Sequence, residues 1–283
     1  MSNLPEFKGN PKLRYFIGDV RDKERLLRAF EGIDIVIHAA ALKQVPACEY
    51  NPFEAVKTNI IGAQNIIDAA IDRNVKKVVA LSTDKACSPI NLYGATKLCS
   101  DKLFIAGNFY VGAKSTKLSV VRYGNVAGSR GSVIPFFEKL IADGVKELPI
   151  TDNRMTRFWL KLEEAVEMVI TAIDTMDGGE LFVRKIPSMK ITELATAMAP
   201  NLPTKEIGIR PGEKIHEMMI SKEDSRNTVE MDKYYIILPE MDELKQKITH
   251  KGKPVADNFE YHSGNNNQWL SMDQMKGLIN EID

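Results

Sequence analysis

The sequence is poor in several features that mark large classes of protein. It contains three cysteines, and their spacing fits neither a metal site nor a disulfide framework. An odd number of scattered thiols is typical of proteins kept in a reducing compartment. Lysine plus arginine and aspartate plus glutamate each number 38, so no basic excess marks the chain for nucleic acid or an anionic membrane. No apolar run approaches the roughly 20 residues of a membrane-spanning helix and no signal peptide is recognisable, so we predict a cytoplasmic protein.

Short apolar runs alternate with amphipathic segments through the first part of the chain. This alternation is typical of an α/β fold with a parallel, doubly wound sheet. The expected strands are 13–17, 33–38, 75–82 and 118–123. The expected helices are 22–30, 52–73 and 92–110. Gly62 lies within the second of these helices, where it is expected to allow close packing rather than to bind a ligand.

After residue 125 this rhythm loosens. A loop is expected at 128–131. Further helices are expected at 132–142, 162–175 and 191–199, and further strands at 156–160 and 181–185. The segment 251–267 is polar and is expected to be rich in loops. A terminal helix containing 275–279 is expected to follow it.

The most informative residues lie where the strand 75–82 ends and the next helix begins. Ser82-Thr83-Asp84-Lys85 ends the strand, and Tyr93 and Lys97 are spaced i and i+4 in the helix. Residues at this spacing share a helix face, so the phenol and the ammonium can point at one site. An ammonium beside a phenol lowers its pKa, which makes tyrosine a usable base near neutral pH. The pattern predicts oxidation of an alcohol, although Tyr93 and Lys97 alone also fit an ordinary surface pair.

Several further motifs accompany this pair. In chain order they are Ile17-Gly-Asp-Val-Arg-Asp22, His38-Ala-Ala-Ala-Leu-Lys-Gln-Val-Pro46, Arg122-Tyr-Gly-Asn-Val126, Gly128-Ser-Arg-Gly-Ser-Val133 and Arg210-Pro-Gly-Glu-Lys214. With Tyr93 and Lys97 they resemble the extended branch of the short-chain dehydrogenase/reductase superfamily, from about residue 12 to the C-terminus. Thr83-Asp84-Lys85 narrows the resemblance. Retaining sugar-nucleotide 4,6-dehydratases carry Thr-Asp-Glu there, whereas the inverting UDP-N-acetylglucosamine 4,6-dehydratases carry Thr-Asp-Lys.

The resemblance implies oxidation at C4 of a UDP-linked N-acetylhexosamine, loss of water across C5 and C6, and inversion at C5. Tyr93 would take the C4 hydroxyl proton while hydride passes to NADP (or NAD), and Lys97 would hold the cofactor ribose. Lys85 would remove the C5 proton, provided that its amine is partly neutral. Asp84 would protonate the departing C6 hydroxyl, and Thr83 would hydrogen-bond the C4 oxygen or the substrate nearby. The 4-keto-6-deoxy product would serve surface polysaccharide or glycan biosynthesis.

The resemblance also implies which residues contact each ligand. Cofactor contacts would come from Asp19, Val20, Ala39, Ala40, Lys43, Leu81, Ser82, Tyr93, Lys97 and Val126. Substrate contacts would come from Lys43, Thr83, Asn125, Arg130, Gly131, Ser132, Val133, Ile134, Arg157, Arg210 and Glu213. On the residues alone, 210–213 also fits a surface turn, and Arg157 also fits an exposed side chain on a strand. His38 lacks partner ligands, so no metal site is expected.

One part of the fold that the resemblance implies has no matching motif in the sequence. A dinucleotide-binding sheet holds the pyrophosphate at a glycine-rich turn between its first strand and the following helix. Gly9 is the only glycine before the first expected strand. The glycine-rich segment 128–132 follows a later strand, so it cannot be this turn. We therefore expect a doubly wound, parallel Rossmann-type sheet that lacks its first β-α-β unit, through a partial gene, a split polypeptide or a misassigned start. The strand 33–38 would then have a bare apolar edge, which invites aggregation and weakens the fold.

Two parts of the chain are expected. A truncated cofactor-binding domain would occupy 1–185, with an insertion at about 126–157 that contributes to the substrate site, and a smaller substrate lobe and tail would occupy 186–283. The resemblance also implies a homo-oligomer. A sugar-nucleotide epimerase stays open, although simple C4 epimerisation needs neither a C5 base nor a C6 acid. A remnant that binds nucleotide sugar without the cofactor stays open as well.

Overall fold

The computed structural model describes residues 9–129 and 131–281. Its largest element is a seven-stranded sheet in the order β1-β2-β3-β7-β12-β11-β13. These strands are β1 (Ile35–His38), β2 (Lys77–Leu81), β3 (Lys117–Arg122), β7 (Leu181–Arg184), β12 (Tyr234–Ile237), β11 (Thr228–Glu230) and β13 (Lys253–Pro254). The first four are parallel, and the last three pair antiparallel with their neighbours. The predicted α/β class with a mainly parallel sheet is confirmed.

The burial of each strand follows from its place in this sheet. Three successive residues are buried in β2 and five in β3, because both strands are covered on both faces. In β1 burial alternates instead. Val36 and His38 are buried, whereas Ile35 and Ile37 are 46% and 51% exposed. No described strand pairs with the outer side of β1, so β1 is an edge strand.

The predicted strand at 13–17 is wrong, because these residues form no strand. Phe16 is half exposed and Ile17 is 95% exposed. An apolar segment becomes a strand only where a neighbouring strand completes its backbone hydrogen bonds, and no described strand pairs with this one. Its contacts come from Arg25 instead. The Arg25 Nε donates to the Ile17 carbonyl at 2.7 Å, and the guanidinium lies 4.8 Å from the centre of the Phe16 ring.

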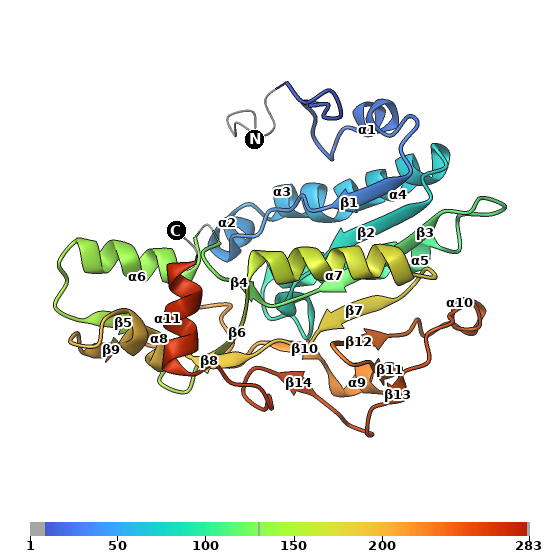
Figure 1. Cartoon of the computed structure of the whole chain (residues 1–283). Coiled ribbons are helices and arrows are strands. Elements are labelled where there is room, and N and C mark those ends of the chain that lie inside the picture. Colours follow the sequence, from blue (N-terminus) through green and yellow to red (C-terminus); the bar gives the residue numbers. More distant parts are fainter. Residues whose placement is uncertain (1–8, 130, 282–283) are drawn as a thin grey trace.

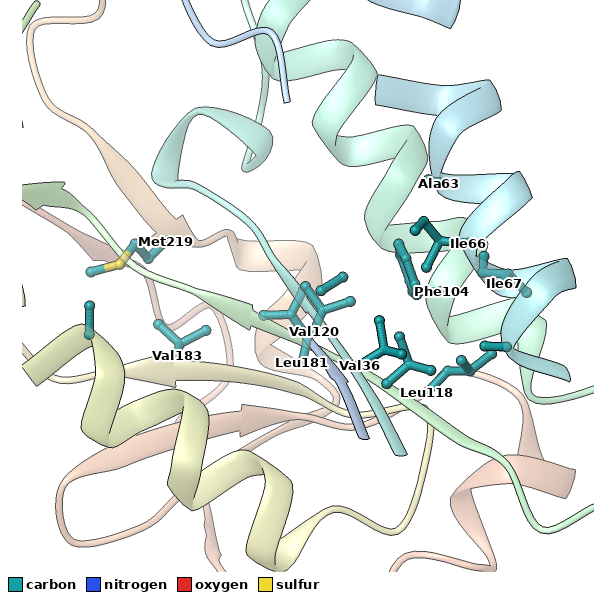
Figure 2. Close-up of a cluster of buried hydrophobic side chains, with 14 of the residues drawn as sticks. Val36, Ala63, Ile66, Ile67, Phe104, Leu118, Val120, Leu181, Val183 and Met219 are labelled. Carbon is teal, nitrogen blue, oxygen red and sulfur yellow. The ribbon is translucent and has the colours of Figure 1, made fainter. Parts of the chain in front are cut away.

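One face of the sheet is covered by the helices of the first part of the chain. They are α1 (Lys23–Ala29), α2 (Val45–Tyr50), α3 (Pro52–Val56), the π-helical η2 (Lys57–Ile61), α4 (Gly62–Asp72) and α5 (Leu92–Gly107). Figure 2 shows Ile66 of α4 and Phe104 of α5 directed toward Leu118 and Val120 of β3 within the main core. A Cβ on Gly62 would lie 2.8 Å from the Val20 side chain, which confirms that this glycine permits close packing.

The opposite face of the sheet is covered by α7 (Leu162–Thr175), as Figure 1 shows. Met168 and Val169 of α7 pack in one cluster with Val79 and Val121 of the sheet. The outer side of the helix carries exposed apolar residues, namely Leu162, Val166 and Ile170. Within the described ranges, no helix combines the length and the apolar character needed to cross a membrane.

A smaller lobe surrounds a second core at the end of the molecule where Figure 1 shows α6, α8 and α11. Its elements are β4 (Asn125–Val126), α6 (Val133–Ala142), β5 (Leu148–Ile150), β6 (Thr156–Leu160), β8 (Ser188–Lys190), α8 (Ile191–Met198), β9 (Thr204–Glu206) and α11 (Met272–Asn280). Trp159 and Ile134 are fully buried there. The remaining short elements are η3 (Asp84–Ala86), β10 (Met218–Ile220), α9 (Lys222–Ser225), α10 (Asp242–Lys245) and β14 (Tyr261–His262).

The boundary between 185 and 186 stays a prediction. Two features of the structure link the parts of the chain on either side of this boundary. The strands β11, β12 and β13 come from the C-terminal part of the chain and extend the large sheet. In addition, β6 pairs with β8 across the predicted boundary.

Candidate active site

The segment Ser82–Lys85 leaves the carboxyl end of β2 and turns under the control of its neighbours. The Ser82 N–H donates to the Val121 carbonyl at 2.7 Å, and its hydroxyl donates to the Asp101 carboxylate at 2.7 Å. Thr83 then caps the short η3 helix, its hydroxyl accepting from the Lys85 N–H at 3.3 Å. Sequence reasoning missed Asp101, which anchors the turn from α5.

The start of α5 is packed directly against this turn. Asn91 caps the helix, its side-chain oxygen accepting from the Gly94 N–H at 2.8 Å. A Cβ on Gly94 would lie 2.2 Å from the Lys85 carbonyl oxygen, so only glycine permits this approach. Tyr93 is consequently held close to Thr83, whose side chain acts to lower the pKa of the phenol, and is only 8% exposed. The structure thus brings the predicted turn and the predicted tyrosine together.

Asp84 and Lys85 form an ion pair inside the protein. The Lys85 Nζ lies 3.0 Å from the Asp84 Oδ1, and the Asp84 side chain is 1% exposed. Burial raises the pKa of Asp84, and the nearby Glu217 carboxylate raises it further, against the pull of Lys85. A raised pKa brings Asp84 closer to the protonated form that its predicted role as an acid requires.

The protonation state of Lys85 differs from the partly neutral amine that was expected. Burial alone would lower the pKa of Lys85, but the carboxylates of Asp84 and Glu217 outweigh burial and raise it. The amine is therefore charged in this structure. Lys85 must lose a proton before it can act as the predicted base, because only the neutral amine can accept the C5 proton.

The pKa of Tyr93 also differs from the expectation. Burial raises it to about 12, and the cation that opposes this rise is Lys85 rather than Lys97. No hydrogen bond or ion pair within the described ranges joins Tyr93 to Lys97. Lys97 is 3% exposed, and burial lowers its pKa, with Asp101 opposing the change. The positive charge of Lys97 in turn helps burial to lower the pKa of His38 to about 4.

The predicted cofactor residues lie in several segments. Ala39, Ala40 and Lys43 are exposed and follow β1, and Leu81 and Val126 are half-buried. The loop that carries Lys43 is tied down by Asn59 of the π-helical turn, whose amide donates to the Leu42 carbonyl and to the Thr96 hydroxyl, both at 2.9 Å. Because β1 and β2 are parallel, their carboxyl ends bring this loop and the Ser82–Lys85 turn to one edge of the sheet.

Asp19 and Val20 have partners of their own. The pKa of Asp19 is lowered to about 2 by hydrogen bonds from Arg21, whose guanidinium lies 2.6 Å from the carboxylate. Val20 packs against Gly62, and its carbonyl accepts from the Asn65 amide at 3.0 Å. No hydrogen bond or ion pair within the described ranges joins this pair to the Ser82–Lys85 turn. Their role as cofactor contacts stays a prediction.

Three predicted substrate residues carry buried polar atoms without a hydrogen-bond partner among the described residues. These atoms are Asn125 Oδ1, Ser132 Oγ and Glu213 Oε2. A buried acceptor left without a partner costs about 1–3 kcal/mol, so such atoms mark places where a ligand can supply the missing donors. This pattern fits the predicted contacts.

The other predicted substrate residues are placed less uniformly. Arg210 is exposed and forms an ion pair with Glu213 at 2.8 Å. The Gly212 carbonyl of the same loop accepts from the Asn91 amide at 2.8 Å, which ties the loop to the start of α5. Gly131 has a positive φ of 76°, which suits a glycine turn. Val133 begins α6 and packs against the second core, in which Ile134 is fully buried, while Arg130 lies outside the described residues.

Arg157 is neither exposed nor free. It is 9% exposed, its Nη1 donates to the Thr156 and Ile215 carbonyls at 2.7 and 3.2 Å, and its Nε lies 3.7 Å from the Glu217 carboxylate. The same carboxylate lies 3.3 Å from the Lys85 Nζ. Sequence reasoning missed Glu217. Glu217 lies shortly after Lys214, the last residue of the Arg-Pro-Gly-Glu-Lys motif. Extending that motif toward the C-terminus would have included it.

One group of potential metal ligands lies elsewhere. Among the described residues, Asp177, Glu180 and His250 place ligand atoms within 4.8 Å of one another. Both oxygens of Glu180 already accept hydrogen bonds. Oε1 accepts from the Asp177 N–H and from His250, and Oε2 accepts from the Ser119 hydroxyl and the Gly178 N–H. Glu180 therefore serves as an internal acceptor that joins two loops to β3.

Comparison with known proteins adds independent information. The chain matches the family model described as "Polysaccharide biosynthesis protein" over residues 2–239. It is 59% identical over 278 residues to a UDP-N-acetylglucosamine 4,6-dehydratase (inverting) of Campylobacter jejuni subsp. jejuni serotype O:23/36 (strain 81-176), covering 96% of this chain and 83% of that protein. It is 42% identical over 279 residues to a UDP-glucose 4-epimerase of Rickettsia akari (strain Hartford), covering 97% and 82%.

The fold comparison agrees with the sequence comparison. The X-ray structure of Pen from Bacillus thuringiensis superposes with a TM-score of 0.87 at 39% identity, covering 97% of this chain and 83% of that chain. The same kind of fold occurs in DesIV, a dTDP-glucose 4,6-dehydratase from Streptomyces venezuelae solved with NAD and TYD, at a TM-score of 0.68 and 24% identity over 76% of this chain and 73% of that one. On these matches, the chain belongs to the polysaccharide biosynthesis protein family and has the fold of the extended short-chain dehydrogenases/reductases.

Proposed function

We propose that this chain catalyses the inverting 4,6-dehydration of UDP-N-acetylglucosamine with NADP as cofactor. The observation that carries the proposal is the Asp84–Lys85 ion pair, which is packed against the helix that bears Tyr93. Elimination of water across C5 and C6 needs a base at C5 and an acid at the C6 hydroxyl. A simple dehydrogenase or epimerase needs neither. The 59% identity to the C. jejuni dehydratase supports the same reaction.

Bound NADP would supply the oxidation at C4 by accepting hydride, and would return the hydride at C6. Tyr93 takes the proton of the C4 hydroxyl, and Thr83 hydrogen-bonds the same oxygen. The ketone at C4 acidifies C5, and the Lys85 amine removes the C5 proton once it is neutral. Asp84 protonates the departing C6 hydroxyl, which leaves as water. Return of a proton to C5 from the opposite face gives the inverted product.

The described residues fit one half of the cofactor. The ammonium of Lys97 is buried on the same helix as Tyr93, and the small side chains of Ala39 and Ala40 at the end of β1 leave room for close approach. Together they suit a nicotinamide riboside, with Lys97 on the ribose hydroxyls. Within 9–129 and 131–281, no strand of the main sheet leads through a glycine-rich turn into a helix, so these residues offer no such cradle for the pyrophosphate.

The proposal extends to the setting of the reaction. The preference for NADP over NAD rests on the family resemblance, as does assembly into a homo-oligomer. We further propose a cytoplasmic enzyme whose 4-keto-6-deoxy product serves surface polysaccharide or glycan biosynthesis. The substrate diphosphate would be bound by the segment 131–134 at the start of α6 and by Arg210, because guanidinium groups bind phosphate oxygens bidentately.

The test is incubation of the chain in D₂O with UDP-N-acetylglucosamine and either NADP⁺ or NAD⁺. The expected product has lost one water, carries a ketone at C4 and contains deuterium at an inverted C5, which mass spectrometry and NMR detect. Replacing Lys85 by Ala should lower this rate about 10³-fold, within the usual range for loss of a general base. Lys222→Ala, which removes an exposed lysine, is the control and should leave the rate unchanged.

Two other outcomes separate the alternatives. A product of unchanged mass with inverted C4 would favour an epimerase, the activity named for the Rickettsia akari relative. Thermal stabilisation by UDP-N-acetylglucosamine but not by NADP⁺, without turnover, would favour a module that only binds nucleotide sugar.

A further inference from the structure

A third carboxylate faces the Asp84–Lys85 pair from a distant part of the chain. Glu217 precedes β10, is 3% exposed, and places its Oε1 3.3 Å from the Lys85 Nζ and 3.7 Å from the Arg157 Nε. Lys85 therefore lies between two carboxylates, at 3.0 Å from Asp84 and 3.3 Å from Glu217. The predicted base is held from both sides.

Glu217 is fixed in this place by its backbone. Its N–H donates to the Ser263 hydroxyl at 3.0 Å, and its carbonyl accepts from the Ser263 N–H at 2.8 Å. The Ser263 hydroxyl also bonds to Thr156 of β6, whose N–H donates to the Ile215 carbonyl at 3.0 Å. The segment is thus held between β6 and β14, so Glu217 has little freedom to leave Lys85.

This arrangement stabilises the fold less than its contacts suggest. The Glu217 Oε2 and the Asp84 Oδ2 are both buried and have no hydrogen-bond partner among the described residues. Each such acceptor costs about 1–3 kcal/mol, and a buried ion pair repays its desolvation only when its remaining polar atoms are also satisfied. A cluster built for stability alone would not leave two acceptors unsatisfied. Such costs are typical of sites where charge is used in the reaction.

We propose that Glu217 is a positioning residue for the C5 proton transfer, holding the Lys85 Nζ in place and stabilising the ammonium that forms when the amine takes the C5 proton. The inference rests on the proposed function. The C5–H bond breaks, its electron pair forms a C4–C5 double bond while the C4 carbonyl becomes an enolate oxygen, and the proton bonds to the Lys85 nitrogen. Asp84 changes its charge when it protonates the C6 hydroxyl. Burial would raise the pKa of Glu217, but Lys85 and Arg157 outweigh it and lower the pKa, which favours a carboxylate that keeps its charge during the reaction.

The sign of the effect follows from the charges that face Lys85. These are the carboxylates of Asp84 and Glu217, the cations of Arg157 and Lys214, and the phenol of Tyr93. The carboxylates favour the ammonium, and the cations oppose it. Glu217→Gln keeps the shape of the side chain and removes one negative charge. The neutral fraction of Lys85 should therefore rise, while the ammonium formed in the reaction loses a partner.

The test has one readout that needs no turnover. Lys85 is 25% exposed, so its neutral amine can be trace-labelled with fluorodinitrobenzene and quantified by peptide mass spectrometry across pH. In Glu217→Gln the labelling profile of Lys85 should move to lower pH by about one unit, a tenfold change in its acid dissociation constant. The ascending limb of the kcat profile should move in the same direction, with KM for UDP-N-acetylglucosamine little changed. Glu260→Gln, which removes a carboxylate 3.8 Å from Lys222, is the matched control and should move neither readout for Lys85.

The outcomes keep the two proposals apart. If wild-type protein forms no dehydrated product, the proposed function fails, while labelling still reports on the Glu217–Lys85 pair. If wild-type protein turns over but Glu217→Gln leaves both pH profiles in place, the role of Glu217 is overturned. Glu217→Asp keeps the charge and should retain the wild-type pH profiles, which distinguishes loss of charge from a damaged fold.

Discussion

Gly94 is the residue on which the geometry of the site depends most directly. It lies between Tyr93 and Lys97, and its missing side chain lets α5 approach the Lys85 backbone. The motif alone predicted that Tyr93 and the Thr83–Lys85 turn belong to one site. It did not predict that Lys85 would be the cation acting on Tyr93, because the direction of a lysine side chain depends on tertiary contacts.

Replacing Gly94 by Ala should therefore move α5 away from the turn. A Cβ at 2.2 Å from the Lys85 carbonyl oxygen cannot be accommodated without backbone movement. A displacement of about 1 Å in a catalytic group can cost about 100-fold, so we expect dehydration to fall by at least that factor. Gly277→Ala on α11 is the control, because its Cβ would have no neighbour within 4 Å. Similar activities for the two variants would contradict this account.

At the scale of elements, the strands and helices of the parallel sheet were largely predictable, because buried apolar runs and amphipathic periods are local in sequence. The predicted helix at 162–175 coincides with α7, which covers this sheet, and the predicted strand at 156–160 coincides with β6 of the smaller lobe. The segment 13–17 failed because pairing, not composition, makes a strand. The π-helical turn at 57–61 and the return of β11, β12 and β13 to the large sheet have no local signal, since they depend on contacts distant in sequence.

The edge position of β1 gives a prediction about association. Ile37 is 51% exposed on a strand whose outer backbone groups pair with no described strand. Such edges template pairing with other chains, and a lysine on the edge disfavours it. Ile37→Lys should lower light scattering of the concentrated protein, whereas Ile170→Lys, which removes a comparably exposed isoleucine from helix α7, should lower it less. Equal effects would show that general surface apolarity, rather than the strand edge, causes the association.

At the scale of the whole molecule, Glu180 joins β3 to the loops at 177–178 and 250. Burial alone would raise its pKa, but hydrogen bonds from His250, Ser119 and the backbone lower it below 4.5. A carboxylate whose pKa is lowered on folding stabilises the protein fully above its unfolded pKa. That contribution is lost as the pH falls through the folded pKa.

Glu180→Gln should therefore destabilise the protein at neutral pH, by about 2–4 kcal/mol, since an amide cannot accept all the hydrogen bonds that the carboxylate accepts. The difference in unfolding free energy between this variant and wild type should narrow as the pH falls below 4.5. This value is the ordinary pKa of a glutamate, and the pKa of folded Glu180 lies below it. Urea unfolding at several pH values measures it. Glu138→Gln, at an exposed position of α6, is the control. A difference independent of pH would mean that the charge of Glu180 is not what matters.

The molecule also shows why part of the site escaped sequence reasoning. Thr83, Asp84, Lys85 and Tyr93 are close in sequence, so a motif reveals them. Glu217 reaches the same place only because β6 and β14 hold its backbone. A contact such as that between Glu217 and Lys85 forms only when distant parts of the chain have folded together, so the local sequence does not reveal it.

The separation of Lys85 and Glu217 along the chain has a consequence for biosynthesis. Protein synthesis proceeds from the N-terminus, and folding can begin before synthesis ends. Strands β1, β2 and β3 and helix α5 leave the ribosome before the segment that carries Glu217 and Ser263. A nascent sheet can therefore bring Asp84 beside Lys85 while the second carboxylate is still being translated, so the proposed acid–base pair is completed only as the last part of the chain emerges.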